Sequence, residues 1–126
     1  MSKKIYNKIT QNNEKFLAVL IDPDKISTEK YNKIIKYQSE KFVDFIFVGG
    51  SIVNNSIDKL VKQLKKDCDV PIVIFPGNPS QISLNAHGIL YLSLISGRNP
   101  DYLIGHHVLS AMQLKNSKLE VIPTGY

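Results

Sequence analysis

Short apolar runs alternate with amphipathic stretches along most of this chain, a pattern that predicts alternating strands and helices. Five runs are expected to be strands: residues 16–21, 44–48, 71–75, 88–95 and a run that opens at residue 119. The runs are nearly continuous in apolar side chains, as in FLAVLI and IVIF, which is typical of parallel strands covered on both faces. The predicted fold class is therefore α/β, with about five parallel strands in one sheet.

Amphipathic segments precede or separate these strands and are predicted to be helices. An opening helix is expected near residues 3–13, a second begins after Ser27, a good N-cap, and a third begins at Asn55 or Ser56. Apolar side chains recur at helical spacing in all three segments. Those expected to face the core are Ile5 and Ile9, then Tyr31, Ile34 and Ile35, and then Ile57, Leu60, Val61 and Leu64.

The second half of the chain contains one strong helix start and one link without a helix. Asn99-Pro100-Asp101 combines a capping side chain, a proline suited to the first helical position and an acid near the positive end of the dipole. We expect that helix to bury Ile104, Val108 and either Ala111 or Met112. Residues 76–87 (PGNPSQISLNAH) are too rich in turn formers for a crossover helix, so an irregular loop over the strand ends is expected. A long loop in that place more often serves a binding site than a simple connection.

Length and composition fit a single globular domain. A chain of 126 residues with 43% hydrophobic and 21% charged residues is long enough to bury a real core. No apolar run approaches the roughly 20 residues of a membrane span, and the N-terminal segment lacks the apolar region of a signal peptide. A cytoplasmic protein is therefore expected. The single cysteine, Cys68, excludes an internal disulfide, and its flanking acids Asp67 and Asp69 disfavour the thiolate.

The net charge of +5 raises the question of a nucleic-acid partner, but the distribution of charge argues against one. Lysines are scattered over the polar sides of the predicted helices, and Arg98 is the only arginine. No arginine-rich tract, helix-turn-helix spacing or RNP-type aromatic motif occurs. No nucleic-acid partner is expected; attraction to an anionic membrane surface, as a peripheral contact, or to a phosphorylated substrate is the alternative.

The first two predicted strands are followed by residues that could bind a ligand or a metal. One is followed by Asp22-Pro23-Asp24 and the other by Gly49-Gly50-Ser51. The carboxyl ends of parallel strands share the edge of the sheet at which α/β proteins bind ligands and metals. Carboxylates beside a hydroxyl and bare backbone favour a hard cation and a phosphate group. Asp24 is equally well explained as a turn or helix-start acid.

Five motifs occur in a fixed order from about residue 16 to residue 126: LIDPDK, FVGGS, IFPGNPSQIS, GILYLSLISGRNPDYLIGHH and VIPTGY. Together they resemble the geranylgeranylglyceryl phosphate synthase family, which includes the bacterial heptaprenylglyceryl phosphate synthases. The resemblance implies a (β/α)8 TIM barrel whose third helix is replaced by a loop. Residues 1–126 are then expected to form one domain, the N-terminal portion of an incomplete barrel. The implied activity is a Mg²⁺-dependent prenyl transfer from a polyprenyl diphosphate to sn-glycerol 1-phosphate in ether lipid biosynthesis.

The same resemblance assigns roles to residues at the strand ends. Asp22 and Ser51 take the metal positions, and Asp22 is expected to be the catalytic carboxylate because its Mg²⁺ neutralises the departing diphosphate. Gly49, Gly50 and Ser51 are expected to bind the substrate, since glycine lets an anion approach the backbone closely. Arg98, beside the predicted helix start, is expected to pair with the diphosphate. A surface arginine next to a helix cap explains Arg98 equally well.

Several other residues are interpreted as structural. His106 and His107 point about 100° apart on a helix, and we interpret them as partly buried, hydrogen-bonded histidines. His87 stands where the family pattern usually carries an aspartate, which leaves an acidic role there without support. Core packing is the preferred explanation for four residues that would otherwise line a groove for the prenyl tail: Phe75, Ile82, Tyr91 and Leu94.

The resemblance also implies what this chain does not contain. In the family, glycerol phosphate is held by later strands, so a truncated form with negligible activity of its own is expected. The unpaired outer edge of the fifth strand favours association, and a homo-oligomer is expected. Two alternatives stay open: a non-catalytic half-barrel that dimerises through its open sheet edge, and another TIM-barrel enzyme with a phosphorylated ligand, such as an aldolase or isomerase. A lysine within a strand would favour the last, and no predicted strand contains one.

Overall fold

Five parallel strands form a single sheet in the computed structural model, which describes residues 3–126. The strands are β1 (Ala18–Ile21), β2 (Phe45–Val48), β3 (Ile72–Ile74), β4 (Gly88–Ser93) and β5 (Glu120–Gly125). The helices are α1 (Lys4–Gln11), α2 (Thr28–Ser39), α3 (Ile57–Asp67) and α4 (Gly105–Lys115), with a short 3-10 helix, η1, at Pro100–Tyr102. None of the described helices is long and apolar enough to cross a membrane.

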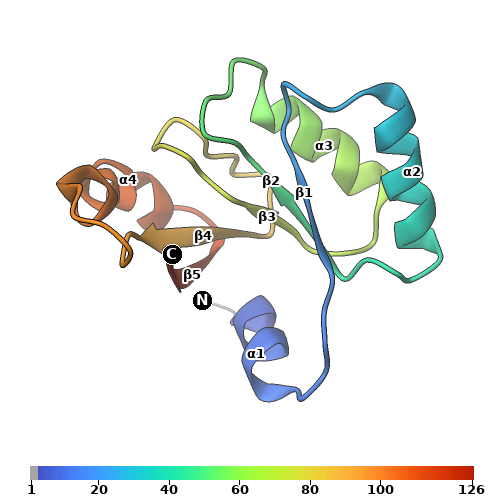
Figure 1. Ribbon diagram of the computed structural model, residues 1–126, viewed down its shortest axis with the longest axis horizontal. Coiled ribbons are helices and arrows are strands. Elements are labelled where there is room, and N and C mark those ends of the chain that lie inside the picture. Colours follow the sequence, from blue (N-terminus) through green and yellow to red (C-terminus); the bar gives the residue numbers. More distant parts are fainter. Residues whose placement is uncertain (1–2) are drawn as a thin grey trace.

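Each strand lies beside its neighbour in the sequence, so the order across the sheet is β1-β2-β3-β4-β5. Every adjacent pair is parallel, with Ala18 opposite Phe45 at one side and Gly88 opposite Glu120 at the other. The predicted α/β class with about five parallel strands is therefore confirmed. Because all strands run the same way, the loops that follow β1, β2 and β3 gather at one edge of the sheet (Figure 1).

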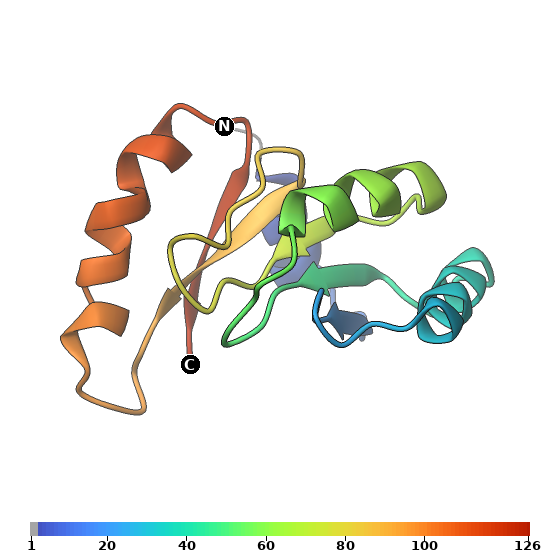
Figure 2. The same cartoon turned by 90° about the horizontal axis from the view of Figure 1, so that it is seen from above.

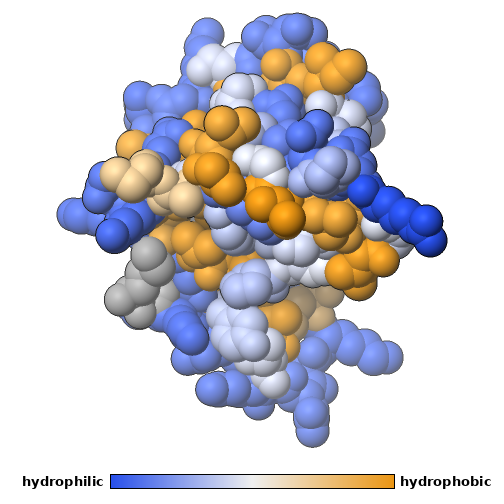
Figure 3. All heavy atoms as spheres, turned by 90° about the vertical axis from the view of Figure 1, so that its left-hand side faces the viewer, coloured by the Kyte–Doolittle hydropathy of each residue, from blue (hydrophilic) through white to orange (hydrophobic). Residues whose placement is uncertain are grey.

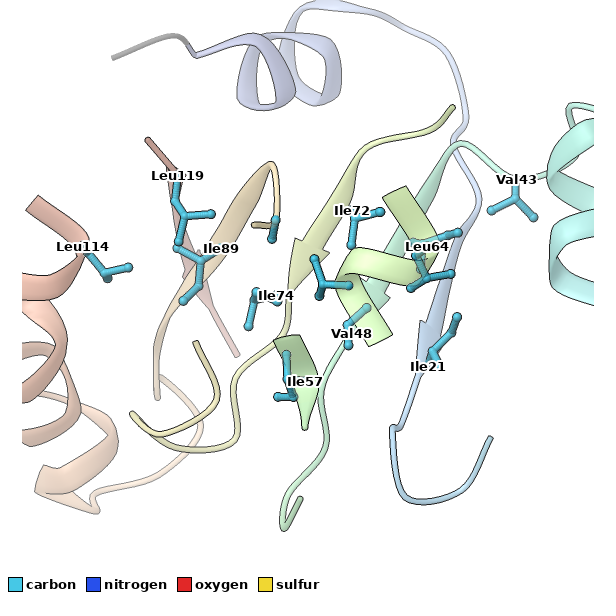
Figure 4. Packing of buried hydrophobic residues seen from close by; sticks show 13 residues of the cluster. Ile21, Val43, Val48, Ile57, Leu64, Ile72, Ile74, Ile89, Leu114 and Leu119 are labelled. Atoms are coloured by element: carbon cyan, nitrogen blue, oxygen red, sulfur yellow. The ribbon is translucent and has the colours of Figure 1, made fainter. Parts of the chain in front are cut away.

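The larger buried cluster lies between the sheet and the helices α2, α3 and α4. Figures 1 and 2 show α2 and α3 side by side on this face, with α4 at the other end of the sheet. Helix α3 contributes Ile57, Val61 and Leu64, whose spacing places them on one helical face. The strand residues that meet these helices include Ile21, Val48, Ile72, Ile74 and Ile89 (Figure 4).

The predicted helix starts and buried faces of α2 and α3 are confirmed. The hydroxyl of Ser27 accepts a hydrogen bond from Lys30 N, and that of Ser56 accepts one from Lys59 N, both at 3.2 Å. Each serine thus satisfies a backbone donor that the first helical turn leaves without a partner. The α2 side chains that pack against the cluster are the three expected ones: Tyr31, Ile34 and Ile35.

The opposite face of the sheet carries a second buried cluster, which helix α1 closes. This cluster combines alternate strand residues with Ile5: Phe45, Val73, Leu90 and Ile122. Helix α1 is held there by Glu120, whose carboxylate accepts hydrogen bonds from Ile5 N at 2.8 Å and Tyr6 N at 2.7 Å. The opening helix is confirmed, but Ile9 is 41% exposed, so the prediction that it shares the buried face of Ile5 was wrong.

The helix expected from Asn99 differs from the prediction. The Asn99 side chain accepts a hydrogen bond from Asp101 N at 3.0 Å, but it caps only the short helix η1, and α4 begins at Gly105. Within α4 the face that meets the rest of the protein carries Ser110 and Leu114, which are its buried residues. The residues expected inside are exposed instead: Ile104 by 65%, Val108 by 68% and Met112 by 69%. Figure 3, which views the side of the molecule that carries α4, shows the resulting apolar surface.

The environment of Cys68 confirms that its thiolate is disfavoured. Burial raises the pKa of this thiol to about 11, and the carboxylates of Asp67 and Asp69 add to the effect. Asp67 also accepts a hydrogen bond of 2.7 Å from the Tyr31 hydroxyl, which joins helices α2 and α3. The thiol therefore lies in a structural contact region, away from the loops at the carboxyl edge of the sheet.

Candidate functional site

Asp22 directly follows β1 and is held by its own turn. Its Oδ1 accepts a hydrogen bond from Asp24 N at 2.9 Å, and its carbonyl oxygen accepts from Lys25 N at 3.0 Å and Ile26 N at 3.1 Å. The side chain is only 15% exposed. An aspartate that accepts a bond from the backbone two residues on is a typical turn former, and here the turn also fixes the direction of the carboxylate.

The loop after β2 lies against this carboxylate. A Cβ atom on Gly50 would stand 2.8 Å from Asp22 Oδ2, so only glycine lets the two segments meet here. A Cβ on Gly49 would stand 1.9 Å from the carbonyl oxygen of Phe75, on the next strand. The structure therefore places Asp22 against the residue that precedes Ser51, as the shared sheet edge predicts.

The N–H groups of both glycines already have protein partners. Gly49 N donates to the carbonyl of Ile21 at 3.0 Å, and Gly50 N donates to Oε1 of Gln81 at 3.2 Å. The structure thus assigns these glycines a packing role. The expected contact of Gly49 and Gly50 with a substrate stays a prediction, and it would involve their unsubstituted Cα atoms rather than free N–H donors.

Gln81 joins two loops at this edge, and it was missed from the sequence. The side chain is 2% exposed, and its Oε1 accepts a second hydrogen bond from Gly77 N at 3.0 Å. Its Nε2 donates to the carbonyl of Gly50 at 2.6 Å. The expectation of an irregular loop over the strand ends is confirmed and indicated the right segment, but no local pattern singles out this glutamine within PSQIS.

Two further carboxylates fix the outer parts of the same loops. Asp24 accepts hydrogen bonds from the backbone of Asn54 and Asn55, both at 2.8 Å, and these bonds lower the pKa of its carboxyl group. Asp24 therefore ties the loop after β1 to the loop after β2, in agreement with its reading as a structural acid. Asp58 on α3 accepts hydrogen bonds from Ser83 and Asn85 in the link between β3 and β4, both at 2.7 Å.

Two pockets lie at this edge of the sheet. The first, of about 480 Å³, is lined by polar and apolar residues that include Gly50, Ser51, Phe75, Leu94 and Tyr102. The second, of about 360 Å³, is lined by Asp22 together with basic and apolar side chains, among them Lys25, Lys30, Lys33 and Tyr37. Leu20 lines both pockets. Asp22 and Ser51 therefore lie at one edge of the sheet, each lining one of two pockets that share Leu20.

The four residues considered for a prenyl groove are divided between two pockets. Phe75 and Leu94 line the pocket that contains Ser51, whereas Ile82 and Tyr91 line a small apolar pocket of about 40 Å³. Both pockets share wall residues, including Tyr102 and Leu92. The apolar surface at this edge is thus continuous from the loop after β2 to helix α4.

The donors at this edge fit a Mg²⁺ ion that takes most of its ligands from elsewhere. Within residues 3–126 no three or more His, Cys, Asp and Glu side chains are grouped so as to hold a metal. The ammonium of Lys25 lies 3.2 Å from Asp22 Oδ2, so the positive charge nearest to this carboxylate is an exposed lysine. Mg²⁺ commonly binds through one or two carboxylates, water and substrate phosphates, so one aspartate and one exposed serine hydroxyl are a sufficient protein contribution.

Arg98 and the histidines differ from Asp22 and Ser51 in their position relative to the two pockets. Arg98 is exposed and lines neither pocket, so its contact with a diphosphate stays a prediction. His107 Nε2 lies 2.6 Å from the carbonyl oxygen of Leu92, and its ring stacks on Tyr91 at 4.3 Å. The interpretation of His107 as a structural, hydrogen-bonded histidine is confirmed. His106 packs edge-on against the ring of Tyr102.

His87 lies at the opposite edge of the sheet. Its Nδ1 accepts a hydrogen bond of 3.0 Å from Ile72 N, at the start of β3. Burial, together with the nearby charge of Lys65, lowers the pKa of this imidazole. A neutral ring that accepts from the backbone is a structural element, and its distance from the carboxyl edge excludes it from the candidate site.

Fold and site together define a class: a parallel α/β protein whose strand-end loops carry an aspartate, two glycines and a serine around open pockets. A comparison with family models identifies the family within that class. The model described as the PcrB family matches residues 7–126, so this chain belongs to the PcrB family.

Curated relatives and solved structures agree with this assignment. The geranylgeranylglyceryl phosphate synthase of Chitinophaga pinensis is 51% identical over 130 residues, covering 100% of this chain and 52% of the relative. That of Flavobacterium johnsoniae is 49% identical, covering 100% of this chain and 55% of the relative. The chain therefore spans about half the length of the relatives that it matches.

Two solved synthases from Thermoplasma share the fold. The wild-type protein of Thermoplasma volcanium superposes with a TM-score of 0.84 at 30% identity, and the match covers 100% of this chain and 51% of that protein. The protein of Thermoplasma acidophilum, solved in complex with sn-glycerol-1-phosphate, also superposes with a TM-score of 0.84. It is 32% identical, and the match covers 98% of this chain and 50% of that protein. These neighbours are TIM barrels, so the five strands form part of such a barrel.

Proposed function

We propose that this chain supplies the metal- and diphosphate-binding half of a prenyltransferase of the geranylgeranylglyceryl phosphate synthase type. The names of its relatives support this proposal. The observation that carries it is the Asp22 carboxylate, which is fixed by its own turn and packed against Gly50, next to Ser51. A partly buried carboxylate beside an exposed hydroxyl suits a cation shared with substrate oxygens.

In the proposed reaction the allylic C–O bond of a polyprenyl diphosphate breaks, and its electron pair leaves with the diphosphate. A hydroxyl oxygen of sn-glycerol 1-phosphate forms the new ether bond, and its proton passes to solvent. Asp22 and Ser51 would hold the Mg²⁺ ion, which would supply positive charge to the departing diphosphate. The chain's own contribution is to hold the carboxylate in place through the Asp24 N–H and to let it pack directly against the backbone at Gly50.

The apolar pocket beside Ser51 suits the first part of a prenyl tail. Phe75, Leu92 and Leu94 line it together with Leu20 from β1. Each buried methylene contributes about 0.8 kcal/mol, so even a few isoprene units in contact with this surface would add appreciable affinity. The neighbouring small pocket under α4 extends the same surface.

The remaining partners follow from the relatives. We infer that glycerol phosphate binds in the part of the barrel that lies beyond the matched half, because the synthase of T. acidophilum holds that molecule in a chain twice as long. A cytoplasmic location with peripheral contact to an anionic membrane surface suits a basic protein that acts on lipid precursors. This chain by itself is then expected to bind the diphosphate substrate and to show negligible transfer.

Asp22→Asn tests this function. We expect calorimetric titration of the unmodified chain with geranylgeranyl diphosphate to show binding that requires Mg²⁺, because a diphosphate beside the Asp22 carboxylate would need a cation to compensate the negative charge. The variant is expected to lose that dependence on Mg²⁺, and any measurable transfer should fall by about a thousandfold or more. Asp69→Asn, at an exposed aspartate before β3, is the matched control. Near-normal Mg²⁺-dependent binding or turnover in Asp22→Asn would rule out the metal assignment.

A second candidate is a non-catalytic half-barrel that associates with itself. The observation that favours it is the exposed apolar surface of α4, where Val108, Leu109 and Met112 are each at least 68% exposed. Size-exclusion chromatography with and without prenyl diphosphate and Mg²⁺ separates the two candidates. A dimer that binds no ligand favours association alone, whereas metal-dependent binding favours the enzyme. An aldolase of the Schiff-base type lacks support, because none of the five described strands contains a lysine.

A further inference from the structure

Gln81 is a buried polar side chain in a loop without regular secondary structure. It is 2% exposed, although residues 76–87 form neither helix nor strand. All three of its hydrogen bonds go to the backbone of two glycines, Gly50 and Gly77, which belong to different loops. We propose that Gln81 is a positioning residue that sets the place of Ser51 beside Asp22 and thereby the affinity for Mg²⁺ and diphosphate. This inference rests on the proposed function.

The partners of Gln81 define the orientation of its amide. Oε1 meets two N–H donors, of Gly50 and Gly77, and Nε2 meets one acceptor, the carbonyl oxygen of Gly50. The reverse orientation would set an NH₂ group against two N–H groups, so the observed one is the only arrangement with complementary partners. Because Gly50 is bound through both its N–H and its carbonyl, its whole backbone unit is fixed, and Ser51 follows directly.

Close packing makes this arrangement hard to replace. A Cβ atom on Gly77 would stand 2.3 Å from the carbonyl oxygen of Gly50 and 2.9 Å from that of Ser51. On its other side Gly50 touches the Asp22 carboxylate. Three strand-end loops therefore meet at Gly50, and a shift of this residue changes the distance between the carboxylate and the serine. A metal shared by Asp22 and Ser51 requires that distance to be constant.

A second anchor of the same loop provides a matched control. Asp58 on α3 accepts hydrogen bonds from Ser83 and Asn85, which lie in the same link as Gln81. Asp58 lines neither the pocket that contains Ser51 nor the pocket that contains Asp22. Its hydrogen bonds go to Ser83 and Asn85 rather than to Gly50 or Gly77. Asp58→Ala thus loosens the loop from outside while it leaves the glycine contacts of Gln81 in place.

The experiment compares Gln81→Leu with Asp58→Ala in two measurements. Amide hydrogen exchange by NMR reports the backbone of Gly50 and Gly77, and titration with inorganic pyrophosphate and Mg²⁺ reports the site. In Gln81→Leu we expect exchange at these two amides to accelerate about tenfold or more, because both lose their acceptor. Pyrophosphate affinity should fall by about tenfold or more, whereas Asp58→Ala should stay within about twofold of the unmodified chain in both measurements.

The outcomes separate this inference from the proposed function. Unchanged exchange in Gln81→Leu, or a loss of affinity no larger than in Asp58→Ala, would overturn the positioning role. If the unmodified chain binds no pyrophosphate with Mg²⁺, the proposed function fails, while exchange at Gly50 and Gly77 still decides whether Gln81 orders the loop. Should Gln81→Leu not fold, Gln81→Met takes its place, because it keeps the length of the side chain and removes both the amide acceptor and the amide donor. The same direction of change is expected, and its absence would overturn the inference.

Discussion

The two edges of the sheet each contain a buried polar side chain that joins distant parts of the chain, but the two perform different tasks. At the amino edge, Glu120 binds two backbone N–H groups at the start of α1, 115 and 114 residues away in sequence. At the carboxyl edge, Gln81 binds the backbone of Gly50, 31 residues away, and of Gly77. One residue is charged and holds a helix, and the other is neutral and holds loops.

The difference follows from what each residue binds. The carboxylate of Glu120 meets the positive end of a helix dipole and two donors that the helix leaves free, so it is well compensated although buried. A charge at the position of Gln81 would lie beside the Asp22 carboxylate, across Gly50. A neutral amide orders the loops there without changing the electrostatics around a carboxylate that is to bind a cation. The amino edge therefore stabilises the fold, and the carboxyl edge prepares a site.

Gly49→Ala should have the largest effect and should damage the carboxyl edge. The new Cβ would stand 1.9 Å from the backbone carbonyl of Phe75, so β2 or β3 must move. We expect a loss of about 3 kcal/mol or more in the free energy of unfolding, measured by urea denaturation, together with loss of Mg²⁺-dependent pyrophosphate binding. Gly97→Ala is the control, since its Cβ would meet only the tip of the Leu94 side chain, at 3.0 Å. Equal stability of the two variants would contradict the packing role of Gly49.

Glu120→Gln should have an intermediate effect, confined to the amino edge. The two N–H groups of α1 meet different oxygens of the Glu120 carboxylate, so a glutamine in the same place presents its NH₂ group to one of them. The expected cost is about 1–3 kcal/mol in thermal or chemical unfolding, with faster hydrogen exchange at Ile5 and Tyr6 and unchanged pyrophosphate binding. Glu14→Gln, at an exposed glutamate, is the matched control. Weakened pyrophosphate binding in Glu120→Gln would show that the two edges are coupled and would contradict their separate roles.

Protonation of Asp58 should have the smallest effect. Bonds from Lys62, Ser83 and Asn85 lower the pKa of this carboxyl to about 2, below its value of 3.8 without such partners. A lowered pKa contributes stability above the unfolded value, and that contribution is lost as the pH falls from about 4 to about 2. The side chain is 40% exposed, so about 1 kcal/mol is expected after allowance for solvent screening.

Unfolding curves of the unmodified chain and of Asp58→Ala at several pH values measure this contribution of Asp58 to the free energy of unfolding. The difference in stability between them should be full at pH 5 and should shrink as the pH approaches 2. A difference that does not change over this range would show that the Asp58 hydrogen bonds do not depend on its charge. Pyrophosphate binding at neutral pH serves as the reference for an intact carboxyl edge.

Much of the fold and part of the site could be predicted from local patterns. Ser27 and Ser56 begin helices as expected, because a cap depends on only three or four neighbouring residues. The apolar stripe of α3 predicted its buried face, and the strand ends predicted that Asp22 would lie near the glycine-rich loop. The buried face of α4 could not be predicted, since the helix carries apolar side chains on more than one side and only its packing decides which side is covered.

What the sequence by itself determined is therefore what short-range physics controls: the alternation of strands and helices, the caps, the turn at Asp22 and the motifs that indicate the family. Only the tertiary structure decided the roles of Gln81 and Glu120. A polar side chain in a loop and a glutamate at the start of a strand have no local signature, because the partners that join them to other elements, Gly50 and the start of α1, lie 31 to 115 residues away. Which backbone groups need such a partner is set when the loops and helix α1 pack against the sheet.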